Sequence, residues 1–294
     1  MIYVICGPTC SGKTEASITF ARLLNCPIIN ADAFQVYKDM NIGTAKISKN
    51  HPFYKSTLLL DIVTPDKTFS VKEYQDAFRK VIEPYKDKNV VVCGGTGLYI
   101  KAALFDYVFH EEDNVQIDFD FEKYSNEDLY KQLWSIDQSS ALKIHPNNRK
   151  RVIRALTIAF TSDKKKSEYI AEQKHELIYP NVKFLFINPD RKILYNDINS
   201  RVDEMFDNGL IDEVKILLDK YVLSQTSSKA IGYEEVISYI AGDVSLDSCK
   251  EMIKKRTRNY AKRQVTFFKH QFKCEEFKSS FDLVNSVFKD GQYI

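Results

Sequence analysis

The sequence predicts an α/β fold in which a parallel sheet is covered by helices on both faces and a helical domain is inserted. Short apolar runs, such as IYVIC at 2–6 and NVVVC at 89–93, alternate with segments of helical spacing. This alternation is typical of parallel strands joined by helical crossovers. The strand pattern disappears after residue 105 and resumes with KFLFI at 183–187. We therefore expect a core formed by 1–105 and 181–294, interrupted by a helical insertion domain at 106–180.

Each expected element follows from its local pattern. The apolar runs that end at glycine or polar residues predict strands at 2–6, 27–30, 57–62, 89–93 and 183–187. Apolar residues at helical spacing predict helices at 13–24, 71–85, 97–104, 193–208, 211–220 and 246–272. From residue 193 onward we expect helices only.

The composition is that of an ordinary globular protein. Of 294 residues, 44% are hydrophobic and 28% are charged, with 10 Gly and 8 Pro, which excludes collagen-like, low-complexity and disordered chains. No apolar run approaches the roughly 18 residues of a membrane span, and no signal-peptide pattern is present, so we expect a cytoplasmic protein. The six cysteines form no CxxC pair, which argues against a disulfide scaffold or a zinc site.

Charge is distributed unevenly along the chain. The net charge is only +2, but residues 106–130 hold nine acids and residues 254–273 hold eight Lys or Arg and no acid. A second basic cluster lies at Arg149, Lys150, Arg151 and Arg154. Concentrated positive charge of this kind predicts a polyanionic partner better than the net charge does.

A phosphate-binding motif follows the first predicted strand. Its residues match GxxxxGK[ST] directly before a predicted helix, the context that the motif requires: Gly7, Pro8, Thr9, Cys10, Ser11, Gly12, Lys13 and Thr14. Backbone N–H groups and the helix N-terminus would hold phosphate oxygens, Lys13 would add a charge, and the Thr14 hydroxyl would bind a phosphate-bound Mg²⁺. The core is therefore predicted to be like that of P-loop NTPases. The strand at 89–93 ends without an acidic residue for Mg²⁺, which disfavours a nucleotide kinase.

Six further segments carry a family resemblance. They are NADAFQVY at 30–37, GTAK at 43–46, GGTGLY at 94–99, HPNNRKR at 145–151, AIGYEE at 230–235 and KRQVTFF at 262–268. In this order and spacing the chain resembles the tRNA dimethylallyltransferases, over nearly its whole length. That family transfers a dimethylallyl group from dimethylallyl diphosphate to N6 of adenosine 37, beside the tRNA anticodon. The resemblance implies tRNA and dimethylallyl diphosphate as partners, and we expect a monomer with no stable protein partner.

The resemblance also implies roles for individual residues. It makes Asp32 the catalytic base, places the Thr96 hydroxyl near the reaction centre together with Lys13, and gives Arg201 a contact with the diphosphate. Three alternatives stay open from the residues alone. Asp32 or Thr96 would instead cap a following helix, and Arg201 would pair with Asp197 within its own helix.

The tRNA contacts that the resemblance implies are spread over the chain: Asp32, Ala33, Phe34, Gln35, Thr96, Lys150, Arg151, Val152, Ile153, Arg154, Gly232, Tyr233, Lys262, Arg263 and Gln264. Aromatic residues between the basic residues at 260–272 either stack on unpaired bases or belong to the core. Two rival functions share the phosphate-binding motif. One is an adenylate isopentenyltransferase that uses a free nucleotide, and the other is a nucleotide kinase.

Overall fold

The computed structural model describes residues 1–109 and 119–288. The chain divides into two compact units, one formed by Met1–Leu104 with Tyr179–Ile294 and the other by Phe105–Ile178. The first unit contains the sheet, and the second is helical.

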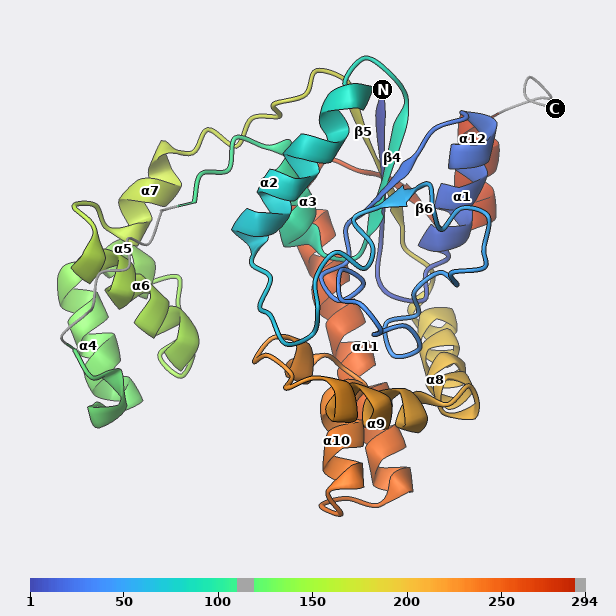
Figure 1. Ribbon diagram of the computed structural model, residues 1–294. Helices are drawn as coiled ribbons and strands as arrows, with labels where there is room; N and C mark the ends of the chain where they lie inside the picture. Colours follow the sequence, from blue (N-terminus) through green and yellow to red (C-terminus); the bar gives the residue numbers. More distant parts are fainter. Residues whose placement is uncertain (110–118, 289–294) are drawn as a thin grey trace. The chain divides into compact units, whose positions relative to one another are not determined.

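A six-stranded sheet forms the centre of the first unit. Its strands are β1 (Ile2–Cys6), β2 (Ile28–Asn30), β3 (Thr57–Leu58), β4 (Val90–Gly94), β5 (Val182–Ile187) and β6 (Glu275–Phe277), in the spatial order β3-β2-β4-β1-β5-β6. All neighbouring strands pair in parallel. Helices α2 (Val71–Ile82) and α3 (Gly97–Leu104) lie on one side of the sheet, and α1 (Lys13–Leu23) and α12 (Ser280–Val287) lie on the other (Figure 1). The predicted fold class is therefore confirmed.

The central strands are apolar throughout because both faces of the sheet are covered. Ile5 of β1, Val91 of β4 and Leu185 of β5 are completely buried, and they pack with Phe20 of α1. The loops that follow β1, β2 and β4 leave the same carboxyl edge of the sheet. In open α/β sheets, ligands bind at this edge.

The end of the chain corrects the expectation of helices alone after residue 193. Residues Glu275–Phe277 form β6, which pairs with β5 at the edge of the sheet. Helix α12 then packs on α1, where the Ser280 hydroxyl donates to Glu15 Oε2 at 3.0 Å. A polar three-residue edge strand carries no periodic signal, so only the pairing with β5 reveals it.

The predicted strand at 57–62 is also corrected, because β3 ends at Leu58. Leu59 and Asp61 adopt φ angles of 62° and 52°. This left-handed conformation cannot continue an extended strand, so the chain turns away from the sheet there.

The described part of the first unit also contains four α-helices, α8 (Arg191–Asp207), α9 (Leu210–Lys220), α10 (Tyr233–Ile240) and α11 (Leu246–Gln271), and two short 3-10 helices at Glu83–Tyr85 and Ser227–Lys229. Helices α8 and α11 pack together through the buried residues Leu194, Ile198 and Ala261. Cys10 of the phosphate-binding motif packs against this cluster. The cluster therefore fixes α8 beside the loop that follows β1.

The second unit has a small core of its own. Its helices are α4 (Asn126–Ile136), α5 (Gln138–Ala141), α6 (Arg149–Thr161) and α7 (Lys166–Glu172). Apolar side chains from α4 and α6, including Leu129, Leu133 and Leu156, are buried against one another. Across both units, no described helix combines the length and the apolar composition needed to cross a membrane.

Candidate active site

The motif at residues 7–14 forms a tight loop between β1 and α1. A side chain on Gly7 would overlap the Ile187 carbonyl and the Ser11 hydroxyl, so only glycine fits there. Cys10 and Gly12 adopt φ angles of 62° and 83°. Left-handed residues of this kind turn successive N–H groups to one side, which makes an anion-binding concavity at the start of α1.

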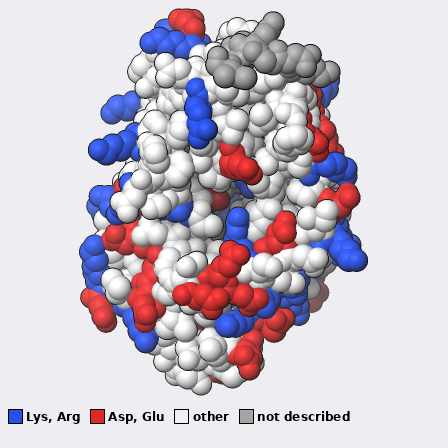
Figure 2. Space-filling view, turned by 90° about the vertical axis from the view of Figure 1, so that its right-hand side faces the viewer, with Lys and Arg blue, Asp and Glu red and all other residues white. Residues whose placement is uncertain are grey.

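Two cations and two carboxylates line the cavity at this loop, which has a volume of about 290 Å³. The cations are Lys13 and Arg201, and the carboxylates are Glu15 and Asp32. The Lys13 ammonium donates to the Pro8 carbonyl at 2.5 Å. Burial lowers the pKa of Lys13, while nearby Cys93 and Asp32 raise it. Figure 2 shows basic and acidic side chains around a hollow in the middle of one face.

Two further observations indicate a site for an anion. Among residues 1–109 and 119–288, neither Lys13 nor Arg201 forms an ion pair, so the alternative pairing of Arg201 with Asp197 is not formed. The Ser11 hydroxyl is buried and has no hydrogen-bond partner there. Two unneutralised cations and an unsatisfied buried hydroxyl would be satisfied together by phosphate oxygens.

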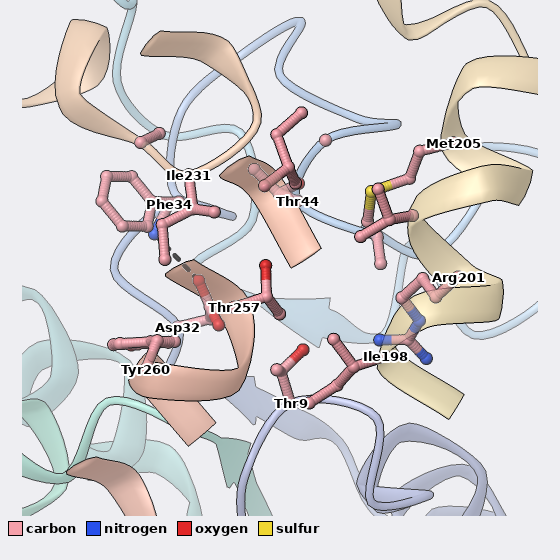
Figure 3. Close-up of a pocket in the computed structure, with 15 residues that line it drawn as sticks. Thr9, Asp32, Phe34, Thr44, Ile198, Arg201, Met205, Ile231, Thr257 and Tyr260 are labelled. Atoms are coloured by element: carbon pink, nitrogen blue, oxygen red, sulfur yellow. Dashed lines mark hydrogen bonds between the residues drawn. The ribbon is translucent and has the colours of Figure 1, made fainter. Parts of the chain in front are cut away.

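Asp32 lies just beyond β2, on the wall of the same cavity. Its Oδ1 accepts the N–H of Phe34 at 2.9 Å (Figure 3). The same oxygen accepts the N–H of Gln35 at 3.3 Å. No helix follows, so Asp32 stabilises a turn and does not cap a helix. Within the described part of the chain, its Oδ2 accepts no hydrogen bond and is available to a ligand.

Thr96 joins the loop after β4 to the loop that holds Asp32. Its Oγ1 accepts the N–H of Ala33 at 3.0 Å, and its own N–H donates to the Ala31 carbonyl at 3.1 Å. The neighbouring Tyr260 phenol has its pKa raised to about 12 by burial and by the Asp32 carboxylate, an effect that hydrogen bonds with Thr96 and Gln264 reduce. Tyr260 therefore keeps its proton at neutral pH and is able to donate it in a hydrogen bond.

A second, more apolar pocket adjoins the cationic cavity. It shares five lining residues with that cavity: Thr9, Asp32, Thr44, Ala45 and Arg201. Its remaining walls carry mainly apolar side chains, among them Phe34, Ile198, Met205 and Ile231 (Figure 3). Val202 and Ile253 line it as well. One connected space thus has a cationic end and an apolar end, a combination that fits a ligand with an anionic head and a hydrocarbon tail.

A family model described as IPP transferase matches residues 35–271. The chain belongs to the IPP transferase family. It is therefore a prenyltransferase enzyme, as the resemblance in the sequence predicts.

Relatives in sequence span nearly the whole chain. The tRNA dimethylallyltransferase of Anoxybacillus flavithermus is 42% identical over 286 residues, covering 96% of this chain and 92% of the relative. The enzyme of the same name from Bacillus subtilis is 41% identical over 283 residues, with coverage of 94% and 90%.

Solved structures of the family share the fold. A tRNA isopentenylpyrophosphate transferase from Staphylococcus epidermidis has a TM-score of 0.71 at 35% identity, covering 97% of both chains. A eukaryotic dimethylallyltransferase, described as acting on tRNA, has a TM-score of 0.80 at 27% identity, covering 97% of this chain and 75% of that one.

Several residues expected at the tRNA surface of this IPP transferase lie in its interior. Gln264 of α11 is 5% exposed; its Oε1 accepts the Thr9 N–H at 2.9 Å and its Nε2 donates to the Gly95 carbonyl at 2.9 Å. The structure therefore places the Gln264 side chain in the interior, and its contact with tRNA stays a prediction. The side chain connects the phosphate-binding loop to the loop after β4.

Tyr233 and Val152, also expected to contact tRNA, are buried as well. Tyr233 is completely buried, and its hydroxyl donates to Glu213 Oε1 at 2.6 Å, while the preceding Gly232 is also buried. Val152 is 1% exposed and belongs to the core of the second unit, against which Ile153 packs. Motif spacing could not show that these side chains point inward.

The remaining expected tRNA residues are accessible. Lys262 and Arg263 are exposed on α11. Phe268 and Phe272 of the same segment are buried, so these two aromatic residues belong to the core and do not stack on bases. In the second unit Lys150, Arg151 and Arg154 are exposed. Arg149, in contrast, donates to the Phe121 and Tyr124 carbonyls at 2.6 and 2.9 Å and so stabilises that unit.

Near the apolar pocket, Ala33, Phe34 and Gln35 are each half-buried. Gln35 Nε2 donates to the Thr44 carbonyl at 3.0 Å. The side chain therefore holds the segment that follows it in the sequence, and its amide oxygen accepts no hydrogen bond from the described residues.

Proposed function

We propose that this enzyme transfers a dimethylallyl group from dimethylallyl diphosphate to N6 of adenosine 37 in tRNA and releases diphosphate. The observation that carries the proposal is the joined cavity. A cationic cradle and an apolar pocket meet at the Asp32 carboxylate. The cradle suits the diphosphate, the apolar pocket suits the five-carbon tail, and a base stands where the two meet.

The first task of the site is to stabilise the leaving diphosphate. The bond between C1 of the donor and the diphosphate oxygen breaks, and negative charge grows on the departing group. The fold fixes the loop N–H groups, a hydrogen bond to the Pro8 carbonyl holds the Lys13 ammonium, and Arg201 lines the same cavity. Preorganised charge of this kind is usually the largest contribution to catalysis.

The second task is to remove a proton from the acceptor. The lone pair of the adenine N6 is delocalised into the ring, so the amine is a weak nucleophile. As its bond to C1 forms, its proton passes to the Asp32 carboxylate, through the oxygen that is free of hydrogen bonds. General-base assistance contributes roughly 10²–10⁴-fold in rate.

Magnesium fits this site as an ion carried mainly by the diphosphate. Within residues 1–109 and 119–288, no group of three or more His, Cys, Asp or Glu side chains could hold a metal alone. The exposed Thr14 hydroxyl offers one ligand beside the cradle. Mg²⁺ usually keeps several waters and takes few protein ligands in addition to phosphate oxygens, so Thr14 would hold it and the ion would neutralise phosphate charge.

The exposed cations serve to bind the tRNA backbone. Lys262 and Arg263 lie on the helix that also carries Tyr260 and Gln264, and Lys150, Arg151 and Arg154 are exposed in the second unit. Adenosine 37 lies in a single-stranded loop, so its extrusion costs only about a few kcal/mol. Such an enzyme would act as a monomer in the cytoplasm, where it meets tRNA.

The decisive experiment compares acceptors. The protein is incubated with dimethylallyl diphosphate and Mg²⁺ in the presence of either unmodified tRNA or AMP, and prenylated adenosine is measured by mass spectrometry. We expect product from tRNA only. Product from AMP would favour an adenylate isopentenyltransferase, and product from neither acceptor would refute the proposal. Strong inhibition by ATP near the KM of the prenyl donor would favour a nucleotide-using enzyme.

The role of Asp32 has a test that separates chemistry from structure. Asp32→Asn keeps an oxygen to accept the Phe34 and Gln35 N–H groups but removes the base. We expect single-turnover rates at saturating tRNA to fall roughly 10²–10⁴-fold, with tRNA affinity changed by less than about threefold. A rate within tenfold of wild type would mean that Asp32 serves only to stabilise the turn.

A further inference from the structure

One wall of the active site is a segment with no regular secondary structure. Residues 42–45 form a turn, in which the Ala45 N–H donates to the Ile42 carbonyl and the Lys46 N–H to the Asn41 carbonyl, both at 3.0 Å. Gly43, Thr44 and Ala45 line the apolar pocket. Thr44 and Ala45 also line the cationic cavity. These turn bonds do not use the N–H groups of residues 41–43, which need other partners.

The Glu213 carboxylate of α9 supplies those partners. Its Oε2 accepts the N–H groups of Asn41 at 3.0 Å and Ile42 at 2.9 Å, and its Oε1 accepts that of Gly43 at 3.2 Å. The Tyr233 hydroxyl donates to Oε1 at 2.6 Å. Three consecutive backbone amides and a phenol therefore converge on one carboxylate, which is a strong, charge-assisted arrangement.

The other end of the segment is held separately. The buried Lys46 ammonium donates to Asp61 Oδ1 at 2.7 Å and to the Tyr37 carbonyl at 2.5 Å. Residues 43–45 thus lie between the contacts made by Glu213 and those made by Lys46. The Tyr233 ring lies directly against Gly43, where any side chain would overlap it. A shift at Glu213 would therefore move the wall of the pocket.

The segment is also connected to the catalytic loop. Gln35 Nε2 donates to the Thr44 carbonyl at 3.0 Å, and the Gln35 N–H donates to Asp32 Oδ1 at 3.3 Å. A continuous series of hydrogen bonds thus leads from Glu213, through residues 41–44 and Gln35, to the Asp32 carboxylate.

We infer that Glu213, supported by Tyr233, is a positioning residue for prenyl transfer. It sets the wall at residues 43–45 against the reacting groups, and through Gln35 it sets the Asp32 turn. This inference rests on the proposed function, and the family relationship assigns no such role to α9. Glu213 touches neither cavity itself, so it acts only through the residues that it holds.

The primary test is Glu213→Gln, which preserves size but replaces one accepting oxygen with an NH₂ group that faces backbone donors. Because a displacement of about 1 Å can cost 10²-fold in rate, we expect single-turnover prenyl transfer at saturating substrates to fall about 10- to 100-fold. The affinity for inorganic diphosphate should stay within about threefold, because the cradle at residues 7–14 is held by other contacts. Tyr233→Phe keeps the ring, removes one donor and should give a smaller loss in the same direction.

A matched control is Asp212→Asn on the same helix, an exposed carboxylate that lies 3.8 Å from Lys215 and away from the segment. It should react at the wild-type rate. The double variant Glu213→Gln with Gln35→Ala should lose little more than the worse single variant, because both act through one series of contacts.

Additive losses in the double variant would overturn the inference, as would a Glu213→Gln enzyme that is less stable but within twofold of the wild-type rate. A separate measurement needs no turnover. The ratio of the affinities for an unreactive thio analogue of dimethylallyl diphosphate and for inorganic diphosphate should fall in Glu213→Gln. If the wild type prenylates no acceptor, the proposed function fails, whereas this ratio still decides the role of Glu213: an unchanged ratio refutes it.

Discussion

Replacing Gln264 with Leu tests whether a buried amide holds the active site together. In the native protein this side chain accepts the Thr9 N–H and donates to the Gly95 carbonyl, both at 2.9 Å. Leu is close in size but can satisfy neither group. A buried backbone group left without a partner costs about 1–3 kcal/mol. Two such groups, offset by the added apolar burial, give an expected loss of about 2–4 kcal/mol in the free energy of unfolding.

The effect should also appear locally and in catalysis. Hydrogen exchange of the peptide containing Thr9 should accelerate, and the KM for the prenyl donor should rise, because the phosphate-binding loop loses its connection to the loop after β4. Gln271→Leu on the same helix is the control, since that amide is exposed and, among the described residues, its one hydrogen bond is accepted from Lys101 at 2.6 Å. Urea unfolding of Gln264→Leu within about 0.5 kcal/mol of the control would refute the reasoning.

Two further predictions concern charge. Burial lowers the pKa of Lys13, so its charge should cost stability below the folded-state pKa, and this cost should vanish as the pH rises past the ordinary value of 10.5. At pH 7 and without ligand, Lys13→Met should therefore be more stable than wild type in urea unfolding. Diphosphate at 100 times its Kd should stabilise the wild type by roughly 2.7 kcal/mol, and Lys13→Met should lose most of this stabilisation. Lower stability of Lys13→Met without ligand would contradict the prediction. For the exposed pair on α11, Lys262→Ala with Arg263→Ala should flatten the slope of log tRNA affinity against log salt by about one and a half units between roughly 50 and 200 mM. An unchanged slope and affinity would place the tRNA contacts elsewhere, at Lys150, Arg151 and Arg154.

The sequence alone determined the fold class, because a buried parallel sheet imposes its own pattern. Strands covered on both faces must be apolar throughout, so β1, β4 and β5 are visible as continuous runs. The loop at residues 7–14 is equally visible, because its close backbone approaches require glycine at fixed positions. Local geometry of this kind depends directly on which residue types occupy the positions, so the sequence alone reveals it.

Only the tertiary structure decided which way the motif residues face. Gln264 follows the exposed Lys262 and Arg263 in its motif, and Tyr233 precedes the half-buried Glu234. Both Gln264 and Tyr233 nevertheless point inward and hold loops of the active site. Glu213 gives no sign of its role, because its partners lie about 170 residues earlier in the chain. The sequence of edge strand β6 also gives no strand pattern, because its three residues form a strand only by pairing with β5. Contacts between distant segments depend on how the whole chain packs, so no local pattern records them.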